Sequence, residues 1–125
     1  MNSPLPILVV DDSAITRRLL ADMLSNLGPY EVAEAKDGQE ALDFMRSRPT
    51  GMVISDLHMG PIDGVQLLNT VRAEADLAHL PFVLMSGDQT PQAISSAIRA
   101  GVTAILAKPF DRHQLAQQVR HALCA

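Results

Sequence analysis

The chain has 125 residues, 47% of them hydrophobic but with three Phe, one Tyr and no Trp, which predicts one domain, residues 1–125, with an aliphatic core. A net charge of −4 argues against direct nucleic-acid binding, and a single cysteine, Cys124, excludes an internal disulfide and fits a reducing compartment. The sequence contains neither a signal-peptide pattern nor a run of about 18 apolar residues, so we expect a cytoplasmic protein that does not enter a membrane.

Five short apolar runs indicate strands along the chain. We expect strands at about residues 6–11, 30–35, 51–56, 81–86 and 103–107. The run at 30–35 is less apolar than the others, as expected of an edge strand. The run from Ile7 to Val10 is continuous, as expected of a strand that is covered on both faces.

Apolar residues at helical spacing separate these strands. In the first helix a stripe recurs every four residues, and we expect it to face the core. Its members are Ile15, Leu19, Met23 and Leu27, widened by Leu20 and Leu24. The later helices have predicted core stripes at Ala41, Leu42 and Met45; at Val65, Leu68 and Val71; at Ala93, Ile94, Ala97 and Ile98; and at Leu115, Val119 and Leu123. The residues expected to cap them are Asp37, Asp63, Thr90 and Asp111. Strands that alternate with helices predict an α/β fold with a parallel sheet covered on both faces.

Polar side chains stand where four of the predicted strands end. Asp11 and Asp12 follow the first strand, Asp56 ends the third, Ser86 ends the fourth and Lys108 follows the fifth. The carboxyl ends of parallel strands share one edge of a sheet, where open α/β sheets bind ligands. Taken alone, Asp56 has an ordinary explanation as the cap of a turn. Independent caps, however, do not predict carboxylate, hydroxyl and ammonium groups at successive strand ends.

Together these groups suit phosphoryl transfer. Three carboxylates repel one another unless a cation lies among them, and an all-oxygen site favours Mg²⁺ or Mn²⁺. An aspartate can attack phosphorus and form an aspartyl-phosphate, which mainly requires positioning and neutralisation of the phosphoryl oxygens. Lys108 supplies a positive charge and Ser86 supplies a hydroxyl donor. Such a site needs no general base.

In order and spacing, Asp11-Asp12, Asp56, Ser86 and Lys108-Pro109 resemble the motifs of response-regulator receiver domains from two-component signalling. The resemblance covers nearly the whole chain, and the five residues Asp11, Asp12, Asp56, Ser86 and Lys108 in register are far more specific than any one of them. It implies a doubly wound (βα)5 flavodoxin-like sandwich, whose parallel five-stranded sheet has the strand order 2-1-3-4-5.

The resemblance also implies the roles of the acceptor and the metal ligands. Asp56 is expected to accept a phosphoryl group from a sensor histidine kinase or a histidine phosphotransfer protein. Asp11 and Asp12 are expected to hold Mg²⁺ together with Asp56 and the backbone carbonyl of His58.

For the remaining motifs the resemblance implies a switch. Ser86 is expected to move toward the phosphoryl group, Lys108 to pair with it, and the Lys108–Pro109 bond to be cis. The protein would then be a signalling switch rather than a turnover enzyme. Phosphorylation would change its binding to an effector protein or output domain, or its dimerisation.

Two positions depart from the family pattern. Gly60 stands four residues after the acceptor, where proline is usual, and Ile105 stands where Tyr or Phe often acts as a rotamer switch. We therefore expect a more mobile loop and a signal route without a flipping ring. The resemblance places the output surface on the fourth helix, the fifth strand and the fifth helix, with the residues Gln92, Ser95, Arg99, Ile105, Arg112 and Arg120.

Two other functions fit parts of this pattern. A small aspartate-nucleophile phosphatase of the haloacid-dehalogenase type uses similar residue types. Its nucleophile lies in an Asp-x-Asp motif on the first strand, which Asp11-Asp12-Ser13 does not provide. A phosphorylation-independent pseudo-receiver binding module stays open because of Gly60 and Ile105, but the complete acidic and basic set argues against it.

Overall fold

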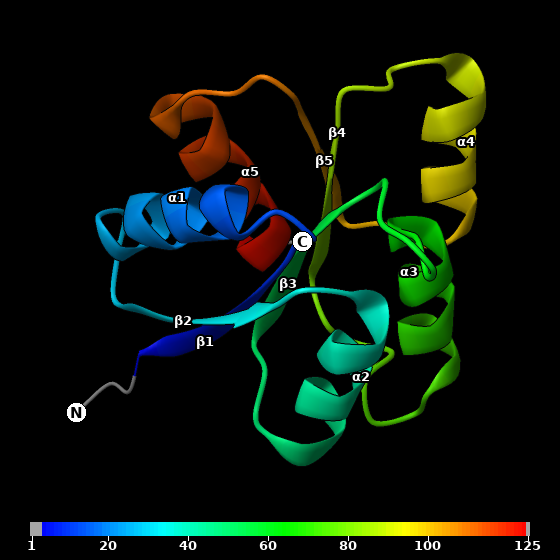
Figure 1. The fold of residues 1–125 in the computed structure, drawn as a ribbon, viewed down its shortest axis with the longest axis horizontal. Helices are drawn as coiled ribbons and strands as arrows, with labels where there is room; N and C mark the ends of the chain where they lie inside the picture. Colours follow the sequence, from blue (N-terminus) through cyan, green and yellow to red (C-terminus); the bar gives the residue numbers. More distant parts are fainter. Residues whose placement is uncertain (1–3, 125) are drawn as a thin grey trace.

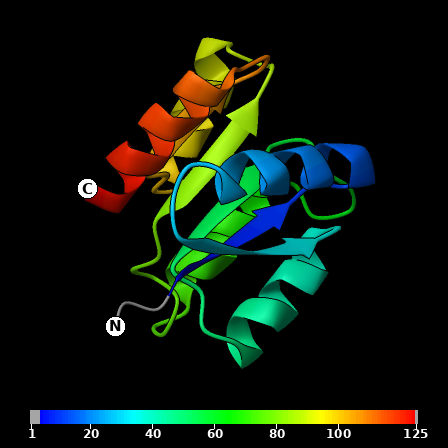
Figure 2. The ribbon, with the colours of Figure 1, turned by 90° about the vertical axis from the view of Figure 1, so that its left-hand side faces the viewer.

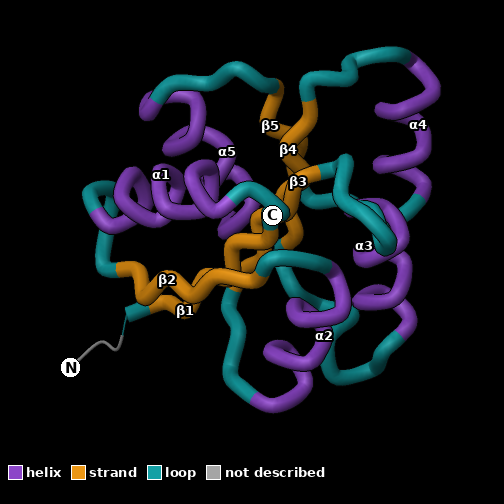
Figure 3. Tube along the Cα trace, viewed as in Figure 1, coloured by secondary structure: helices purple, strands orange, loops and turns teal. Residues whose placement is uncertain are grey.

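A parallel sheet of five strands forms the centre of the molecule, which a computed structural model describes over residues 4–124. The strands are β1 (Leu5–Val10), β2 (Tyr30–Ala35), β3 (Met52–Asp56), β4 (Phe82–Ser86) and β5 (Ala104–Ala107). Their order in the sheet is β2-β1-β3-β4-β5, and the tube in Figure 3 follows them. The α/β fold and the strand order are therefore confirmed, and each strand lies within one residue of its expected range.

Helices cover both faces of the sheet. They are α1 (Ala14–Ser25), α2 (Gly38–Ser47), α3 (Gly64–Ala73), α4 (Pro91–Arg99) and α5 (Arg112–Cys124). Helices α1 and α5 lie on one face, and α2, α3 and α4 lie on the other (Figures 1 and 2). Each face has its own aliphatic core, because alternate residues of β1 and β3 point to opposite sides of the sheet. None of the described helices is long and apolar enough to cross a membrane.

Side-chain caps fix where the helices begin. The Asp63 carboxylate accepts a bond from the Gln66 backbone N–H, and the Gln66 side chain accepts one from the Asp63 N–H, which completes a capping box. Asp111 caps α5 with Gln114 in the same way. Asp37 and Thr90 accept bonds from the third residue of α2 and of α4 respectively. Capping therefore accounts for these acidic residues and leaves Asp11, Asp12 and Asp56 as the set that needs another explanation.

The predicted core stripe of α1 is wrong in its first half. The side chains of Ile15 and Leu19 are 83% and 59% exposed, whereas Leu20 and Leu24 are buried. A helix turns about 100° per residue, so a stripe with a spacing of four drifts about 40° at each step. The series that ends near the sheet at Leu27 therefore begins well away from it at Ile15.

Two other predicted core residues also face solvent. Ile98 on α4 is 63% exposed and Leu123 near the end of α5 is 37% exposed. On α4 the neighbouring Ala97 is buried, and on α5 the neighbouring Ala122 is buried. Cys124 is an exposed free thiol at the end of α5.

Candidate functional site

The register of the sheet aligns the strand ends that carry the polar residues. Asp56 pairs with Met85, and Ser86 pairs with Ala107. On the other side of β3, Val10 pairs with Ser55, so Asp11 leaves β1 beside Asp56. The loops that follow β4 and β5 leave from the same edge of the molecule (Figure 3). The structure thus brings the polar strand ends together, as the sequence predicted.

Three carboxylates form an acidic cluster at this edge. One oxygen from each of Asp11, Asp12 and Asp56 lies within 4.8 Å of the others. Asp11 and Asp56 are buried, at 2% and 8% exposure, while Asp12 is exposed. The cluster therefore has two buried carboxylates and one that is open to solvent.

The surroundings of Asp11 fit a cation. Its Oδ1 accepts a bond from the Ser13 backbone N–H at 2.8 Å, but its buried Oδ2 has no hydrogen-bond partner within residues 4–124. Burial raises the pKa of Asp11 above the ordinary value of 3.8, and the nearby Asp56 carboxylate raises it further. An unsatisfied carboxylate oxygen beside two more carboxylates is the donor set that a hard divalent cation prefers.

A positive charge contacts the cluster from the loop that follows β5. The Lys108 Nζ lies 3.0 Å from Oδ1 of Asp56, and the Lys108 side chain is partly buried. The Lys108 backbone N–H donates to the Ser86 carbonyl oxygen at 2.9 Å, which fixes the start of the β5–α5 loop. The Lys108–Pro109 peptide bond is cis, as predicted, and the Gly60–Pro61 bond is also cis, which the sequence analysis did not anticipate.

The hydroxyl of Ser86 is engaged within its own loop. It donates to the Asp88 carbonyl oxygen at 3.0 Å and accepts from the Asp88 backbone N–H at 2.8 Å. The Asp88 side chain accepts from the Thr90 N–H, which is the main reason that the pKa of Asp88 is lowered. Ser86 is buried at the same edge as Asp56, but its hydrogen bonds are local.

The β3–α3 loop forms the rim of the site. The His58 side chain is exposed, and its Nε2 lies 3.9 Å from Oδ2 of Asp88. Gly64 lies so close to the end of β3 that a Cβ atom there would be 2.4 Å from the Asp56 carbonyl oxygen, whereas a Cβ atom at Gly60 would meet nothing within 4 Å. Close packing of α3 therefore fixes the backbone at Asp56, while the loop before α3 is open.

Two residues that the sequence analysis passed over help to position the site. Arg17 donates to the Asp11 carbonyl oxygen at 2.7 Å and also contacts Glu34 on β2 at 3.2 Å. Asp88 binds the Ser86 hydroxyl through its backbone. Arg17 follows its helix cap by four residues and could have been suspected of reaching back over the preceding loop. No signal in the sequence singled out Asp88.

The residues predicted for the output surface lie on the expected elements. Ile105 is partly buried on the edge strand β5 and packs against the core beneath α4. The polar members are exposed on α4 and α5: Gln92, Ser95, Arg99, Arg112 and Arg120. Their role in output stays a prediction, as does that of the His58 carbonyl.

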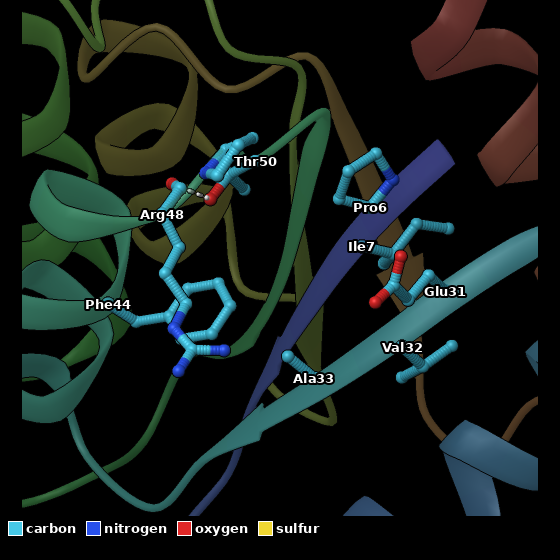
Figure 4. Close-up of a pocket in the computed structure, with 9 residues that line it drawn as sticks. Pro6, Ile7, Glu31, Val32, Ala33, Phe44, Arg48 and Thr50 are labelled. Atoms are coloured by element: carbon cyan, nitrogen blue, oxygen red, sulfur yellow. Dashed lines mark hydrogen bonds between the residues drawn. The ribbon is translucent and has the colours of Figure 1, made fainter. Parts of the chain in front are cut away.

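A partly open cavity lies away from this site. It has a volume of about 210 Å³ and is lined by Pro6, Ala33, Phe44 and Arg48, among others (Figure 4). The Arg48 guanidinium lies 5.8 Å from the centroid of the Phe44 ring. Pro6 and the nearby Thr50 precede the buried parts of their strands, so the cavity is at the opposite edge of the sheet from Asp56.

This fold and this polar edge define a class of protein, and the chain belongs to it. Residues 7–120 match the response regulator receiver domain family, so the chain is a CheY-like receiver of two-component signalling. Receiver domains bind Mg²⁺ at an acidic pocket, and CheY-like members interact with histidine kinases and downstream effectors. The assignment favours the receiver interpretation over the aspartate phosphatase.

Individual relatives agree with this assignment. The chain is 32% identical to chemotaxis protein CheY-3 of Vibrio cholerae over 95% of its own length and 92% of the relative's. It is 34% identical to chemotaxis protein CheY of Pseudomonas aeruginosa, over 90% and 91% of the two chains. Among solved structures, Vibrio cholerae CheY4 matches with a TM-score of 0.91 at 28% identity, covering 97% of this chain and all of the other. A response regulator receiver protein from Pseudomonas putida matches with a TM-score of 0.87 at 30% identity, over 96% and 98% of the two chains.

Proposed function

We propose that this receiver accepts a phosphoryl group on Asp56 from the phosphohistidine of a sensor kinase or phosphotransfer protein, with Mg²⁺ or Mn²⁺ at the acidic cluster. One observation carries the proposal. Three carboxylates converge within 4.8 Å, and a lysine ammonium lies 3.0 Å from the carboxylate of Asp56. A structural salt bridge needs neither three carboxylates nor a buried oxygen without a partner.

The transfer is a substitution at phosphorus. A carboxylate oxygen of Asp56 forms the new P–O bond while the P–N bond of phosphohistidine breaks, and the electron pair stays on the imidazole nitrogen. Lys108 neutralises charge on the acceptor and on the transferred group. Asp11 and Asp12 would hold the cation with Asp56 and the His58 carbonyl, and the bound cation would supply further neutralisation and orientation. Later attack of water on phosphorus breaks the same P–O bond, releases phosphate and restores the carboxylate.

The proposed donor is a protein, and α1 offers it a contact. Ile15 and Leu19 are 83% and 59% exposed on the helix that begins directly after Asp11-Asp12. An apolar face beside the acceptor suits a protein donor better than a small phosphate ester. Ile15→Ser is expected to slow transfer from a phosphorylated kinase about tenfold while leaving phosphorylation by acetyl phosphate unchanged.

Intact mass spectrometry after incubation with acetyl phosphate and Mg²⁺ tests the acceptor. The wild type should gain one phosphoryl group that is lost in base, and EDTA should prevent the gain. Asp56→Asn should abolish it, and Asp12→Ala should weaken metal binding. Asp63→Asn is the matched control, because Asp63 caps a helix on the same loop. A full-occupancy adduct on Asp56→Asn would refute the assignment.

The same preparation separates the alternative functions. Repeated turnover of a generic phosphomonoester would indicate a phosphatase. A wild type that binds its partner but stays unphosphorylated with every donor would indicate a binding module that works without phosphorylation.

The output of the switch is proposed to be the surface of α4, β5 and α5, through partner binding or phosphorylation-dependent dimerisation. Ile105→Ala should leave phosphorylation nearly intact and weaken that output, because Ile105 packs beneath α4 and contributes no charged group to the acidic cluster. NMR shift mapping with beryllofluoride, a phosphoryl mimic, reads the surface directly. Shifts confined to the Asp56 pocket, with residues 90–120 silent, would contradict signalling through this face.

A further inference from the structure

Asp88, in the loop between β4 and α4, makes contacts in three directions. Its backbone N–H and carbonyl both bond to the Ser86 hydroxyl, at 2.8 and 3.0 Å. Oδ1 of its side chain accepts from the Thr90 backbone N–H at 3.0 Å. Oδ2 lies 3.9 Å from Nε2 of His58, in the loop after Asp56. One residue therefore contacts the switch hydroxyl, the start of α4 and the rim of the acceptor site.

The backbone contact restrains the hydroxyl. Ser86 is 3% exposed, and its only hydroxyl hydrogen is donated to the Asp88 carbonyl oxygen. Before Ser86 can donate to a phosphoryl oxygen on Asp56, that bond has to break. The turn at Asp88 must therefore rearrange whenever the hydroxyl changes partner.

The side-chain contact extends this rearrangement to α4. Thr90 is the N-cap of α4, and its Oγ1 accepts from the Ala93 N–H at 3.2 Å. Because the Asp88 carboxylate is bonded to the Thr90 N–H, a shift of the turn pulls on the residue that begins the helix.

The space behind the loop is nearly filled. A void of about 10 Å³ lies between the loop, α4 and β5, and its lining includes Ser86, Asp88, Ala93 and Ile105. Such a void holds at most about one water molecule. Since Ile105 cannot move far into it, the contact through Asp88 offers a route from the site to α4 that needs no aromatic ring on β5.

We propose that Asp88 is a positioning residue that transmits the release of the Ser86 hydroxyl to the first turn of α4, through its bond to Thr90 and with support from His58. This inference rests on the proposed function, since it concerns the conformational response to phosphorylation of Asp56. It predicts that the Asp88 side chain is dispensable for forming the phosphoryl adduct but required for the response of α4.

The test compares wild type, Asp88→Ala and Asp88→Asn by NMR with beryllofluoride and Mg²⁺. Fluorine NMR detects the adduct on Asp56, and amide shifts of residues 90–98 report on α4. In Asp88→Ala the adduct should form, while the α4 shifts should fall to about half or less of the wild-type shifts. Asp88→Asn should restore most of them, because an amide oxygen can still accept from Thr90. Asp76→Ala, an exposed residue before β4, is the control and should behave as wild type.

The outcomes distinguish a failure of the proposed role of Asp88 from a failure of the proposed function, phosphorylation of Asp56. If the wild type forms no adduct, the proposed function fails and the coupling fails with it. If all proteins form the adduct and Asp88→Ala keeps the full α4 response, the proposed function stands and the role of Asp88 is refuted. An Asn variant as impaired as the Ala variant, with the same free energy of unfolding as wild type, would also refute the bond to Thr90 as the route.

Discussion

The two edges of the sheet differ in how the charged side chains there find hydrogen-bond partners. At the amino-terminal edge, Arg72 from the last turn of α3 donates to the carbonyl oxygens of Ala78, Leu80 and Gly101 and to the Thr103 hydroxyl. At the carboxyl-terminal edge, Oδ2 of Asp11 is buried without a hydrogen-bond partner in the described part of the chain. One edge satisfies its charged group with neutral acceptors, and the other gathers three carboxylates and leaves one buried carboxylate oxygen without a hydrogen-bond partner among the described residues.

This difference separates what holds the fold together from what the fold does. Arg72 joins two loops and the end of a helix, and burial lowers its pKa without removing its charge. In the acidic cluster, burial and the neighbouring Asp56 carboxylate both raise the pKa of Asp11, as expected where like charges lie together without a cation. We therefore expect substitutions at the first edge to change stability, and substitutions at the second to change chemistry.

The largest expected effect is a loss of stability caused by a substitution at the carboxyl-terminal edge, where the other substitutions are expected to change chemistry. Gly64→Ala places a Cβ atom 2.4 Å from the Asp56 carbonyl oxygen, so either α3 or the end of β3 has to move. We expect a loss of about 3 kcal/mol in the free energy of unfolding, together with slower phosphorylation. Urea denaturation and mass spectrometry measure the two. Gly60→Ala is the matched control and should change stability little, because a Cβ atom there is unopposed.

The second prediction concerns chemistry alone. Lys108→Met removes the ammonium that lies 3.0 Å from Oδ1 of Asp56 but keeps most of the side-chain volume. The initial rate of phosphorylation by acetyl phosphate should fall about a hundredfold, which is the usual effect of removing one group that stabilises developing charge. Lys36→Met, at an exposed position after β2, should keep the wild-type rate. An equal rate in both variants would mean that the charge of Lys108 is not used.

The sequence could predict the functional edge better than the structural one. Alternation of strands with helices places the strand ends together, so Asp11, Asp56 and Lys108 could be grouped without knowing a single distance. Nothing comparable identifies Arg72, because three of its four acceptors are backbone carbonyls, and every residue in a sequence has a carbonyl group. The contacts of Asp88 with Ser86 were hidden for the same reason, since they too involve the backbone.

Errors in the predicted core have a different origin. Periodicity predicts the apolar side of a helix, but it does not predict how far the helix is rotated about its own axis when it packs on the sheet. Ile15 and Leu19 satisfied the pattern and are nevertheless exposed. Their exposure beside Asp11-Asp12 leaves an apolar surface next to the acidic cluster, which is a reason to regard that misprediction as a sign of function.

A third prediction isolates the structural edge. Arg72→Met removes the donors to three carbonyl groups and one hydroxyl, and should lower the free energy of unfolding by about 2 kcal/mol. Phosphorylation by acetyl phosphate should stay at the wild-type rate. Arg99→Met, an exposed arginine in the last turn of α4, should change stability by less than about 0.5 kcal/mol. Equal losses of unfolding free energy in both variants would show that the Arg72 hydrogen bonds add no more stability than an exposed arginine does.

The smallest expected effect has the opposite sign and belongs to Asp11. In EDTA, Asp11→Asn should raise the free energy of unfolding by about 0.5–1 kcal/mol at pH 7, because it removes a buried charge. The Asn side-chain oxygen can still accept the bond from Ser13.

Burial raises the pKa of Asp11 above 3.8 in the folded protein, so between the unfolded and folded pKa values the folded state binds more protons. The stability of the wild type is therefore lost as pH rises through that window, and the advantage of the Asn variant should grow from pH 3.8 upward and then level off. Urea denaturation at a series of pH values measures this difference. Adding Mg²⁺ should reverse it, since the cation stabilises the wild type more than the variant. An advantage that shrinks as the pH rises would show that the Asp11 carboxylate is satisfied without a cation.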